Sequence, residues 1–170
     1  MVMYGIGDKV LYGTDGVMTV VDEREVTVGG VSRNYYVLRG ADGKSSSETF
    51  VPTDNEELVS KMRPLLTKSE ILLAIKDAAS IDEEEWKGDG RARLQHFRRV
   101  VESGDRAAMI AMIRSIYIAG RERAEEGKRI YLADETVMRR AEQLIHSEFS
   151  EVLGIPEEDV PAFIEENIGK

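Results

Sequence analysis

Residues 26–39 are Val26-Thr27-Val28-Gly29-Gly30-Val31-Ser32-Arg33-Asn34-Tyr35-Tyr36-Val37-Leu38-Arg39, in which β-branched and aromatic residues flank a Gly-Gly pair. Such residues favour strands, and Gly-Gly between two strand-forming runs is typical of a tight β-hairpin. Similar runs occur before and after this stretch, separated by glycine-containing turn segments. The predicted strands span 9–12, 17–21, 26–28, 34–39 and 48–51. So many short strands in about fifty residues favour a small, curled antiparallel barrel of the SH3 or Tudor kind.

The second part of the chain changes to helical periodicity and keeps it to the end. Thr67 or Ser69 is placed to cap the first of these helices, and Asp105 to cap what we predict to be the longest one. We expect Asp134 to start the following helix and Pro156, in a first-turn position, to open the last one. This part of the chain is therefore predicted to be all-α.

The change from strands to helices takes place near Pro64. Strands followed by helices, without alternation between them, predict a two-domain α+β chain rather than one mixed domain. We therefore expect a β domain over residues 1–63 and a helical domain over residues 64–170. Neither part contains an internal repeat or a low-complexity tract.

The overall composition of the 170-residue chain limits its chemistry and its location. Because the chain has no cysteine, it has no disulfide, no thiol nucleophile and no zinc site made of cysteines. It also has no apolar run of about eighteen residues, and its amino terminus lacks a basic segment followed by an apolar one. We expect a cytoplasmic protein that does not enter a membrane.

The sequence offers no motif for catalysis or for cofactor binding. His96 and His146 are far apart, and neither belongs to a His-x-x-x-His or His-Glu-x-x-His motif. The glycines at 13–16 and 88–90 lack the spacing of a phosphate-binding loop, so they indicate turns. We therefore expect a protein that is not an enzyme and that needs no cofactor or metal ion.

Basic residues are concentrated between Trp86 and Arg123, although the net charge of the whole chain is −9. A negative net charge argues against general affinity for nucleic acid, because phosphate contacts need lysine and arginine. A basic block enclosed by acidic segments can nevertheless contact DNA locally. The alternative is a set of helices with surface ion pairs. The candidate DNA-binding residues in this block are Lys87, Arg91, Arg93, Arg98, Arg99, Arg121 and Arg123.

Trp86, the only tryptophan, lies where the charge changes from acidic to basic. A polar-tipped aromatic beside glycines and arginines is a candidate contact for another macromolecule, and it is also a candidate core residue of the helical domain. At helical spacing Arg91 and Arg98 share one stripe, next to a stripe that holds Leu94 and Phe97. Arginines displayed in this way bind the DNA backbone without selecting a sequence. No helix-turn-helix pattern is present, which favours recognition of DNA shape.

Several motifs occur in an order and spacing that extend over nearly the full length of the chain. In the first part they are Ile6-Gly7-Asp8-Lys9-Val10-Leu11-Tyr12, Asp15-Gly16-Val17, Tyr35-Tyr36-Val37-Leu38-Arg39 and Phe50-Val51-Pro52-Thr53-Asp54-Asn55. In the helical part they are Trp86 with Arg91 and Arg93, Ser103-Gly104-Asp105, and Gly127-Lys128 with Leu132-Ala133-Asp134-Glu135. Together these motifs resemble the CarD/CdnL family of bacterial transcription regulators.

The resemblance implies a Tudor-like first domain, similar to the RNA-polymerase-interacting domain of transcription-repair coupling factor, that docks on the polymerase β subunit. It also implies a helical second domain that contacts promoter DNA at the upstream edge of the melted region. By position, Trp86 is then a wedge at the minor groove. The candidate backbone contacts are Lys87, Arg91, Arg93, Arg98 and Arg99. Gly88 and Asp89 stand where some members carry arginines, so we expect either a weaker DNA contact or one that uses Arg121 and Arg123 instead.

The implied mechanism is that of a non-enzymatic regulator that binds polymerase, contacts the upstream fork and changes the stability of the promoter open complex. A strand of the polymerase can pair with an exposed sheet edge near residues 24–28. The candidate contacts are Arg24, Val26, Val28 and Phe50. Phe50 stands where some members have an arginine, and strand alternation allows it to be exposed or buried. The rival hypothesis is a protein-only adaptor whose helical domain is a second protein-interaction module with Trp86 in its core.

Overall fold

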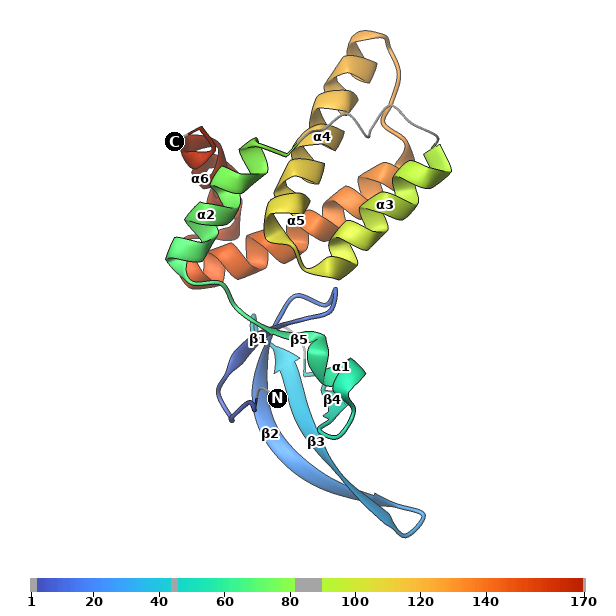
Figure 1. The fold of residues 1–170 in the computed structure, drawn as a ribbon, viewed down its shortest axis with the longest axis vertical. Helices are drawn as coiled ribbons and strands as arrows, with labels where there is room; N and C mark the ends of the chain where they lie inside the picture. Colours follow the sequence, from blue (N-terminus) through green and yellow to red (C-terminus); the bar gives the residue numbers. More distant parts are fainter. Residues whose placement is uncertain (1–2, 44–45, 82–89, 170) are drawn as a thin grey trace. The chain divides into compact units, whose positions relative to one another are not determined.

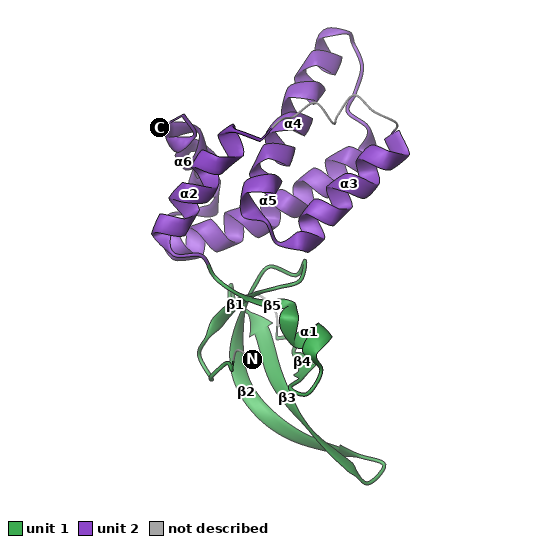
Figure 2. Ribbon diagram, viewed as in Figure 1, with its two compact units in different colours: residues 1–65 green, residues 66–170 purple. Residues whose placement is uncertain are grey.

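The computed structural model describes residues 3–43, 46–81 and 90–169. The chain divides into two compact units, Met1–Leu65 and Leu66–Lys170 (Figure 2). In the described part of the chain, the first unit holds all the strands and one short helix, and the second unit is helical (Figure 1). The predicted order of strands followed by helices is therefore confirmed.

Antiparallel strands form one sheet in the first unit. They are β1 (Lys9–Tyr12), β2 (Val17–Val28), β3 (Val31–Gly40), β4 (Thr49–Pro52) and β5 (Met62–Pro64), in the order β4-β3-β2-β1-β5 across the sheet. The short helix α1 (Glu56–Ser60) connects the two end strands, β4 and β5, and contacts both. The predicted small antiparallel sheet is confirmed. Closure into a barrel would require the two end strands to pair, and no pairing between described strands joins β4 to β5.

The predicted hairpin lies between β2 and β3. Val28 pairs with Val31 across the turn, and the two residues between them are glycines. Gly29 and Gly30 have φ angles of 59° and 81°. Two-residue turns of type I′ need positive φ at both central positions, which glycine adopts without steric cost. The Gly-Gly pair therefore sets the register of the two longest strands.

Strand β2 is continuous, which corrects the prediction of separate strands at 17–21 and 26–28. The acidic and basic residues between those two runs do not interrupt the strand, because β3 pairs with them as well. A register shift between Val20 and Asp22 marks a β-bulge, at which a strand bends while it continues. Helix α1 and strand β5 were not predicted, since they have only 5 and 3 residues and show no periodicity.

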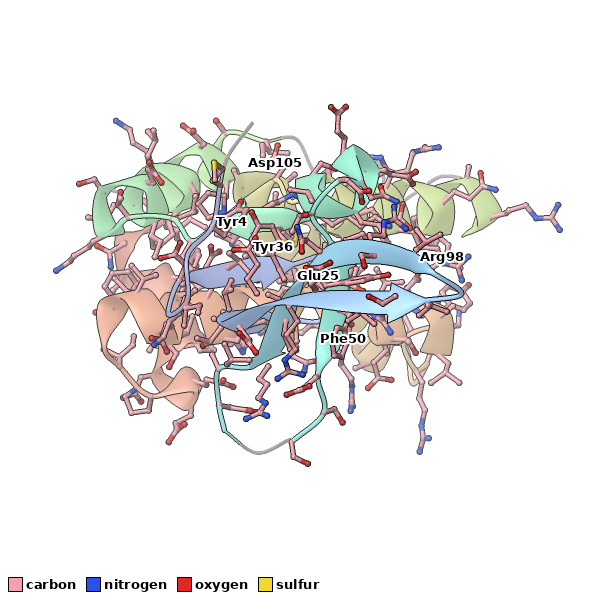
Figure 3. The ribbon with its side chains drawn as sticks, turned by 90° about the horizontal axis from the view of Figure 1, so that it is seen from below. Tyr4, Glu25, Tyr36, Phe50, Arg98 and Asp105 are labelled. Atoms are coloured by element: carbon pink, nitrogen blue, oxygen red, sulfur yellow. The ribbon has the colours of Figure 1, made fainter. Side chains whose placement is uncertain are left out.

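Alternate residues of the strands form the core of the first unit. The buried cluster contains Val10, Met18, Val20, Tyr36, Leu38, Val51 and Met62. Tyr4 and Tyr36 lie next to one another in Figure 3, with their rings edge to face and 6.0 Å between centroids. Because Tyr36 and Leu38 face this core, Tyr35 and Val37 face the opposite side of the sheet.

The second unit is a bundle of helices. They are α2 (Lys68–Ala79), α3 (Gly90–Ser103), α4 (Arg106–Glu125), α5 (Leu132–Leu153) and α6 (Val160–Asn167). Helix α5 contacts each of the other four, and α4 also packs against α2 and α3. The fully buried side chains of this unit include Ile71, Ile75, Met109, Ile110, Ile116, Leu144, Ile145 and Phe149. These residues follow the apolar periodicity seen in the sequence.

Two of the predicted helix caps are present. Thr67 caps α2 with a capping box, in which its hydroxyl accepts from the Glu70 amide and the Glu70 carboxylate accepts from the Thr67 amide. Asp105 caps α4, and its side chain accepts a hydrogen bond from the Ala108 amide at 3.0 Å. Each cap satisfies backbone donors that the first helical turn leaves without partners.

Three predictions about helix boundaries are wrong. The longest described helix is α5, with 22 residues, and α4 has 20. Asp134 does not cap α5, which has Tyr131 at its cap position, because the Asp134 carboxylate is buried inside the unit. Pro156 does not open α6 either: it precedes a 3-10 turn (Glu157–Asp159), and α6 begins at Val160 with a proline in its first turn.

Candidate protein and nucleic-acid interfaces

The outer sheet face is the side of β2, β3 and β4 turned away from the core. Cross-strand pairing places Arg24 opposite Tyr35, and Phe50 opposite Val37. Side chains that are paired across antiparallel strands lie on the same side of a sheet. The outer sheet face therefore includes Asp22, Arg24, Val26, Val28, Arg33, Tyr35, Arg39 and Phe50, and Glu48 joins it just before β4. Val37 is on the same side of the sheet but is fully buried.

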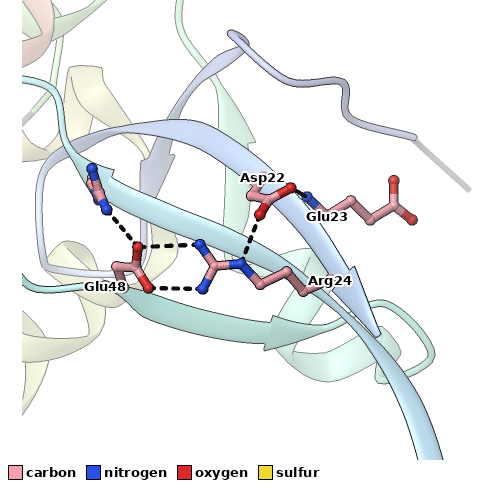
Figure 4. Close-up of polar contacts among 5 residues, drawn as sticks. Asp22, Glu23, Arg24 and Glu48 are labelled. Atoms are coloured by element: carbon pink, nitrogen blue, oxygen red, sulfur yellow. Dashed lines mark hydrogen bonds and ion pairs between the residues drawn. The ribbon is translucent and has the colours of Figure 1, made fainter. Parts of the chain in front are cut away.

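Charged side chains on the outer sheet face form one connected network (Figure 4). Arg24 pairs with Asp22 at 2.6 Å and with Glu48 at 3.2 Å, and Arg39 donates to Glu48 at 2.6 Å. The hydrogen bonds from Arg39 and Arg24 lower the pKa of Glu48, and the hydrogen bond from Arg24 lowers the pKa of Asp22. The network fixes the Arg24 guanidinium over the sheet, although each exposed pair adds little to stability.

Phe50 is exposed on this face, with 43% of its surface accessible. Its ring meets the Tyr35 ring edge to face with 6.0 Å between centroids, and the Arg24 guanidinium carbon lies 5.8 Å from the Phe50 centroid. The structure thus decides the question that strand alternation left open. Arg24 and Phe50, 26 positions apart in the sequence, lie together beside Tyr35, which the sequence did not single out.

Strands β2 and β3 extend beyond their neighbours as a two-stranded ribbon. Strand β1 pairs with β2 only as far as Thr19, and β4 pairs with β3 only from Tyr35 to Leu38. From residue 22 onward, the outer edge of β2 is not paired with any other described strand. Val26 is half-buried and Val28 is exposed on this ribbon. An unpaired strand edge with exposed apolar side chains can accept another strand.

The predicted DNA-contacting residues of the second unit are distributed over two helices. Trp86 and Lys87 lie outside the described residues, so their placement stays a prediction. Arg91, Arg98 and Arg99 are exposed on α3, whose buried residues are Phe97, Val100 and Val101. The predicted inward packing of the apolar stripe of α3 is therefore confirmed. Seven positions of helix separate Arg91 from Arg98, which corresponds to roughly 10 Å along the axis.

Arg93 lies inside the unit rather than on its surface. Its guanidinium pairs with the Asp134 carboxylate at 2.9 Å, and the two side chains are only 9% and 2% exposed. A second contact from the Arg93 Nε to the same carboxylate measures 3.4 Å. Because this pair joins α3 to α5, we assign Arg93 a structural role and omit it from the proposed DNA contacts.

The end of α4 and the start of α5 meet at Tyr131. Arg121 is exposed on α4, whereas Arg123 is half-buried and donates through Nε to the Arg129 carbonyl at 2.8 Å. The Arg123 guanidinium carbon lies 4.2 Å from the Tyr131 ring centroid, and that of Arg93 lies 5.4 Å from it. Sequence reasoning did not single out Tyr131, although an aromatic two residues after a loop arginine was a visible signal.

The described residues contain neither a metal-binding cluster nor a membrane-spanning helix. No group of three or more His, Asp or Glu side chains there is arranged to hold a metal ion. None of the described helices is both long enough and apolar enough to cross a bilayer. The features that remain for function are the outer sheet face of the first unit and the basic and aromatic residues of the second.

Comparison with known proteins assigns the first unit. The sequence model of the CarD-like/TRCF RID domain matches residues 4–65, which is nearly all of that unit and includes the outer sheet face. A comparison with curated proteins found no match. The match covers the strands in which the sequence resemblance was recognised, and it confirms that resemblance for this part of the chain. Residues 4–65 thus form a domain of the CarD-like/TRCF RID family, in keeping with a CarD-like protein.

Proposed function

We propose that this chain is a transcription regulator that docks on the β subunit of RNA polymerase and changes the stability of the promoter open complex. The observation that carries this proposal is the match of residues 4–65 to a family whose RID is an RNA-polymerase-interacting domain. The β subunit, the promoter DNA and the effect on the open complex go beyond that match. The resemblance of the chain to CarD-like regulators implies them, and the surfaces described above are suited to one protein contact and one DNA contact.

The outer sheet face supplies the polymerase contact. Phe50 is an exposed aromatic that contacts both Tyr35 and Arg24. Aromatic residues and arginine are the residue types that most often dominate binding energy at protein interfaces. The neighbouring ribbon offers the unpaired edge of β2 for strand addition, in which main-chain hydrogen bonds supply affinity and side chains supply specificity. Arg24, Val26, Val28 and Phe50 therefore remain the candidate contacts.

The helical unit supplies the DNA contact. Arg91, Arg98 and Arg99 are exposed on α3, and arginines in such positions bind phosphates without selecting a sequence. Arg121 is also exposed, but it lines the groove among α4, α5 and α6 together with Tyr117, so we omit it from the proposed DNA contacts. A chain with a net charge of −9 is expected to bind free DNA weakly. Docking on polymerase raises the effective concentration of this weak surface near the promoter. The mechanism thus needs both units in one chain.

The effect on transcription depends on differential binding. A protein that contacts melted DNA better than closed DNA shifts the equilibrium toward the open complex, and equal contact with both would shift nothing. Trp86, as a wedge at the upstream fork, is the proposed source of this difference. Promoters with different intrinsic open-complex stability are then expected to respond differently.

The adaptor hypothesis is supported by a groove in the second unit. The groove has a volume of about 460 Å³ and lies among α4, α5 and α6. Its lining includes Tyr117 and Ile118, two exposed apolar residues on α4. Exposed apolar side chains around a concave surface are typical of protein contacts. This groove makes a second protein-binding module the alternative function.

The test measures open-complex lifetime on several promoters with the cognate polymerase, without protein, with wild type and with Trp86→Ala. Two charge-reversal variants are compared, Arg98→Glu with Arg99→Glu on α3, and Arg139→Glu with Arg140→Glu on α5. The second pair is a matched control, because it makes the same charge change at two exposed arginines of the same unit. We expect wild type to change the lifetime, the α3 variant and Trp86→Ala to lose most of that effect, and the α5 variant to keep it.

Polymerase binding is measured in parallel, so that loss of the polymerase contact is distinguished from loss of the DNA contact. Phe50→Glu is expected to weaken binding by about 30-fold, the size of a typical interface hot spot. Ile6→Glu changes an exposed apolar residue before β1 and is expected to bind as wild type does. No change in open-complex lifetime despite intact polymerase binding would favour the adaptor.

A further inference from the structure

We propose that Tyr131 and Leu132, at the start of α5, form a second contact to promoter DNA beside the start of α3. This inference rests on the proposed function, because it assigns a new part of the DNA-contacting surface. Neither residue was among the predicted DNA contacts, and both lie outside the family match at residues 4–65.

The Tyr131 ring is presented at the surface in a fixed position. It is 50% exposed, and Leu132, the first residue of α5, is exposed next to it. Arg123 and Arg93 both place their guanidinium groups close to the ring, at 4.2 Å and 5.4 Å from its centroid. Since Arg93 is itself held by the buried Asp134, the ring is supported by residues that are already ordered. A ring ordered in advance loses little conformational freedom when it binds.

The position of the ring connects it with the proposed DNA surface. A shallow hollow of about 430 Å³ is lined by residues from the starts of α3 and α5, including Gly90, Leu94 and Tyr131. Gly90 is the first residue of α3, and Trp86 precedes it by four positions in the sequence. Arg91, an exposed candidate for a phosphate contact, directly follows Gly90. Tyr131 therefore lies beside the start of α3, the helix that follows the proposed wedge segment in the sequence.

The chemistry of this surface favours nucleic acid over protein. Exposed aromatic rings beside arginines are the platforms on which proteins stack unpaired bases, while the arginines bind the adjoining phosphates. The Arg123 guanidinium lies beside the ring, and Lys128 and Arg129 are further basic residues in the loop that leads to Tyr131. Two of the acids in these segments are already paired, Asp134 with Arg93 and Glu126 with Lys128. An unstacked base at the upstream fork is the occupant that fits an exposed ring and an aliphatic side chain.

The test places a photo-crosslinking phenylalanine analogue, p-benzoylphenylalanine, at position 86, 117 or 131 of the full chain. Each protein is assembled with polymerase and a labelled forked promoter fragment, irradiated, and analysed for crosslinks to DNA and to polymerase subunits. Tyr117 is the matched control, because it is another exposed tyrosine of the same unit, 60% accessible, and it lines the groove among α4, α5 and α6. We expect DNA crosslinks from positions 86 and 131 and none from 117.

The outcomes separate this inference from the proposed function. DNA crosslinks from 86 but not from 131 would overturn the inference and leave the proposed function in place. Crosslinks from 131 to a polymerase subunit, rather than to DNA, would also overturn it. An absence of DNA crosslinks from both 86 and 131 would overturn the inference and the proposed function together.

The affinity of the polymerase-bound protein for forked DNA gives a second, quantitative test of the Tyr131 contact. Tyr131→Ala is expected to weaken binding of the polymerase-bound protein to forked DNA by about five- to tenfold, the lower range for loss of one stacked base. Tyr131→Phe keeps the ring and is expected to bind as wild type does. The Tyr131 side chain makes no capping hydrogen bond to α5, so the alanine variant should fold. Equal affinity of wild type and Tyr131→Ala would refute the stacking contact.

Discussion

The ion pair between Arg93 and Asp134 should be one of the strongest single determinants of stability in the helical unit. Asp134→Asn removes the negative charge and leaves the Arg93 guanidinium, only 9% exposed, without its ionic partner. Removal of one partner of a buried pair costs about 3–5 kcal/mol, because the remaining charge is not compensated. Since both side chains are almost fully buried, solvent screening does not reduce this figure much. In a domain of this size, a loss of about 3 kcal/mol lowers Tm by more than about 10 °C.

The assay is urea denaturation followed by circular dichroism at a helix-sensitive wavelength. In the described chain, all helices except the short α1 belong to the second unit, so the signal reports that unit. Glu135→Gln is the matched control: it is also in the first turn of α5, and its pair with Arg139 is surface-exposed. The control should cost less than about 0.5 kcal/mol. Arg93→Met with Asp134→Leu should cost far less than the sum of the two single changes.

The result that would refute this reasoning is a loss below about 1 kcal/mol for Asp134→Asn, which is the range of a surface pair. The same variants also decide the role of Arg93. If Arg93 is structural, Arg93→Met and Asp134→Asn should alter DNA binding to the same extent. A loss of DNA binding with Arg93→Met alone, in a protein as stable as Asp134→Asn, would restore Arg93 as a phosphate contact.

Three further predictions concern the stability of the second unit. The buried Glu148 carboxylate pairs with Arg106 and accepts a hydrogen bond from the Leu66 amide. Glu148→Gln should therefore lower the free energy of unfolding by about 3 kcal/mol and speed hydrogen exchange at the Leu66 amide. Unchanged exchange would contradict this. Burial lowers the pKa of His146 below its ordinary value of 6.5, so the unfolded chain binds the proton more readily. The urea concentration at the unfolding midpoint should therefore decrease as the pH is lowered from about 7.5 to about 5.5, and the decrease should be smaller in His146→Gln. An equal decrease in both proteins would exclude His146 as its source. Gly154 has a φ of 67°, and an added Cβ would meet no atom within 4 Å. Gly154→Ala should therefore lower the stability in thermal unfolding by about 1 kcal/mol through backbone strain alone. An unchanged stability would show that the backbone relaxes.

Much of the local structure follows from the sequence because it depends on neighbours in the chain. The Gly29-Gly30 pair predicts its hairpin, since positive φ at both positions is a local preference of glycine. Thr67 and Asp105 predict their helix starts, because a cap accepts from an amide three residues ahead. The motifs of the first part also identify its family, since they occur in order over residues 4–65.

Other features were not predictable, because they depend on partners distant in sequence. Asp134 is of a residue type that often caps helices, but its carboxylate pairs with Arg93, 41 residues away, and the helix begins before it. That pairing also removes Arg93 from the candidate DNA contacts, among which the basic block and the family resemblance had placed it. Strand alternation could not assign a side to Phe50, because both faces of the sheet carry apolar residues.

The sequence by itself determined the order of strands and helices, several of the turns and caps, and the family of the first unit. Only the tertiary structure decided that Phe50 lies with Arg24 on the outer sheet face, and that Tyr131 lies close to both Arg93 and Arg123. The physical reason is the range of the interactions. Backbone preference and periodicity act over a few residues, whereas burial and ion pairing depend on which segments the folded chain brings together.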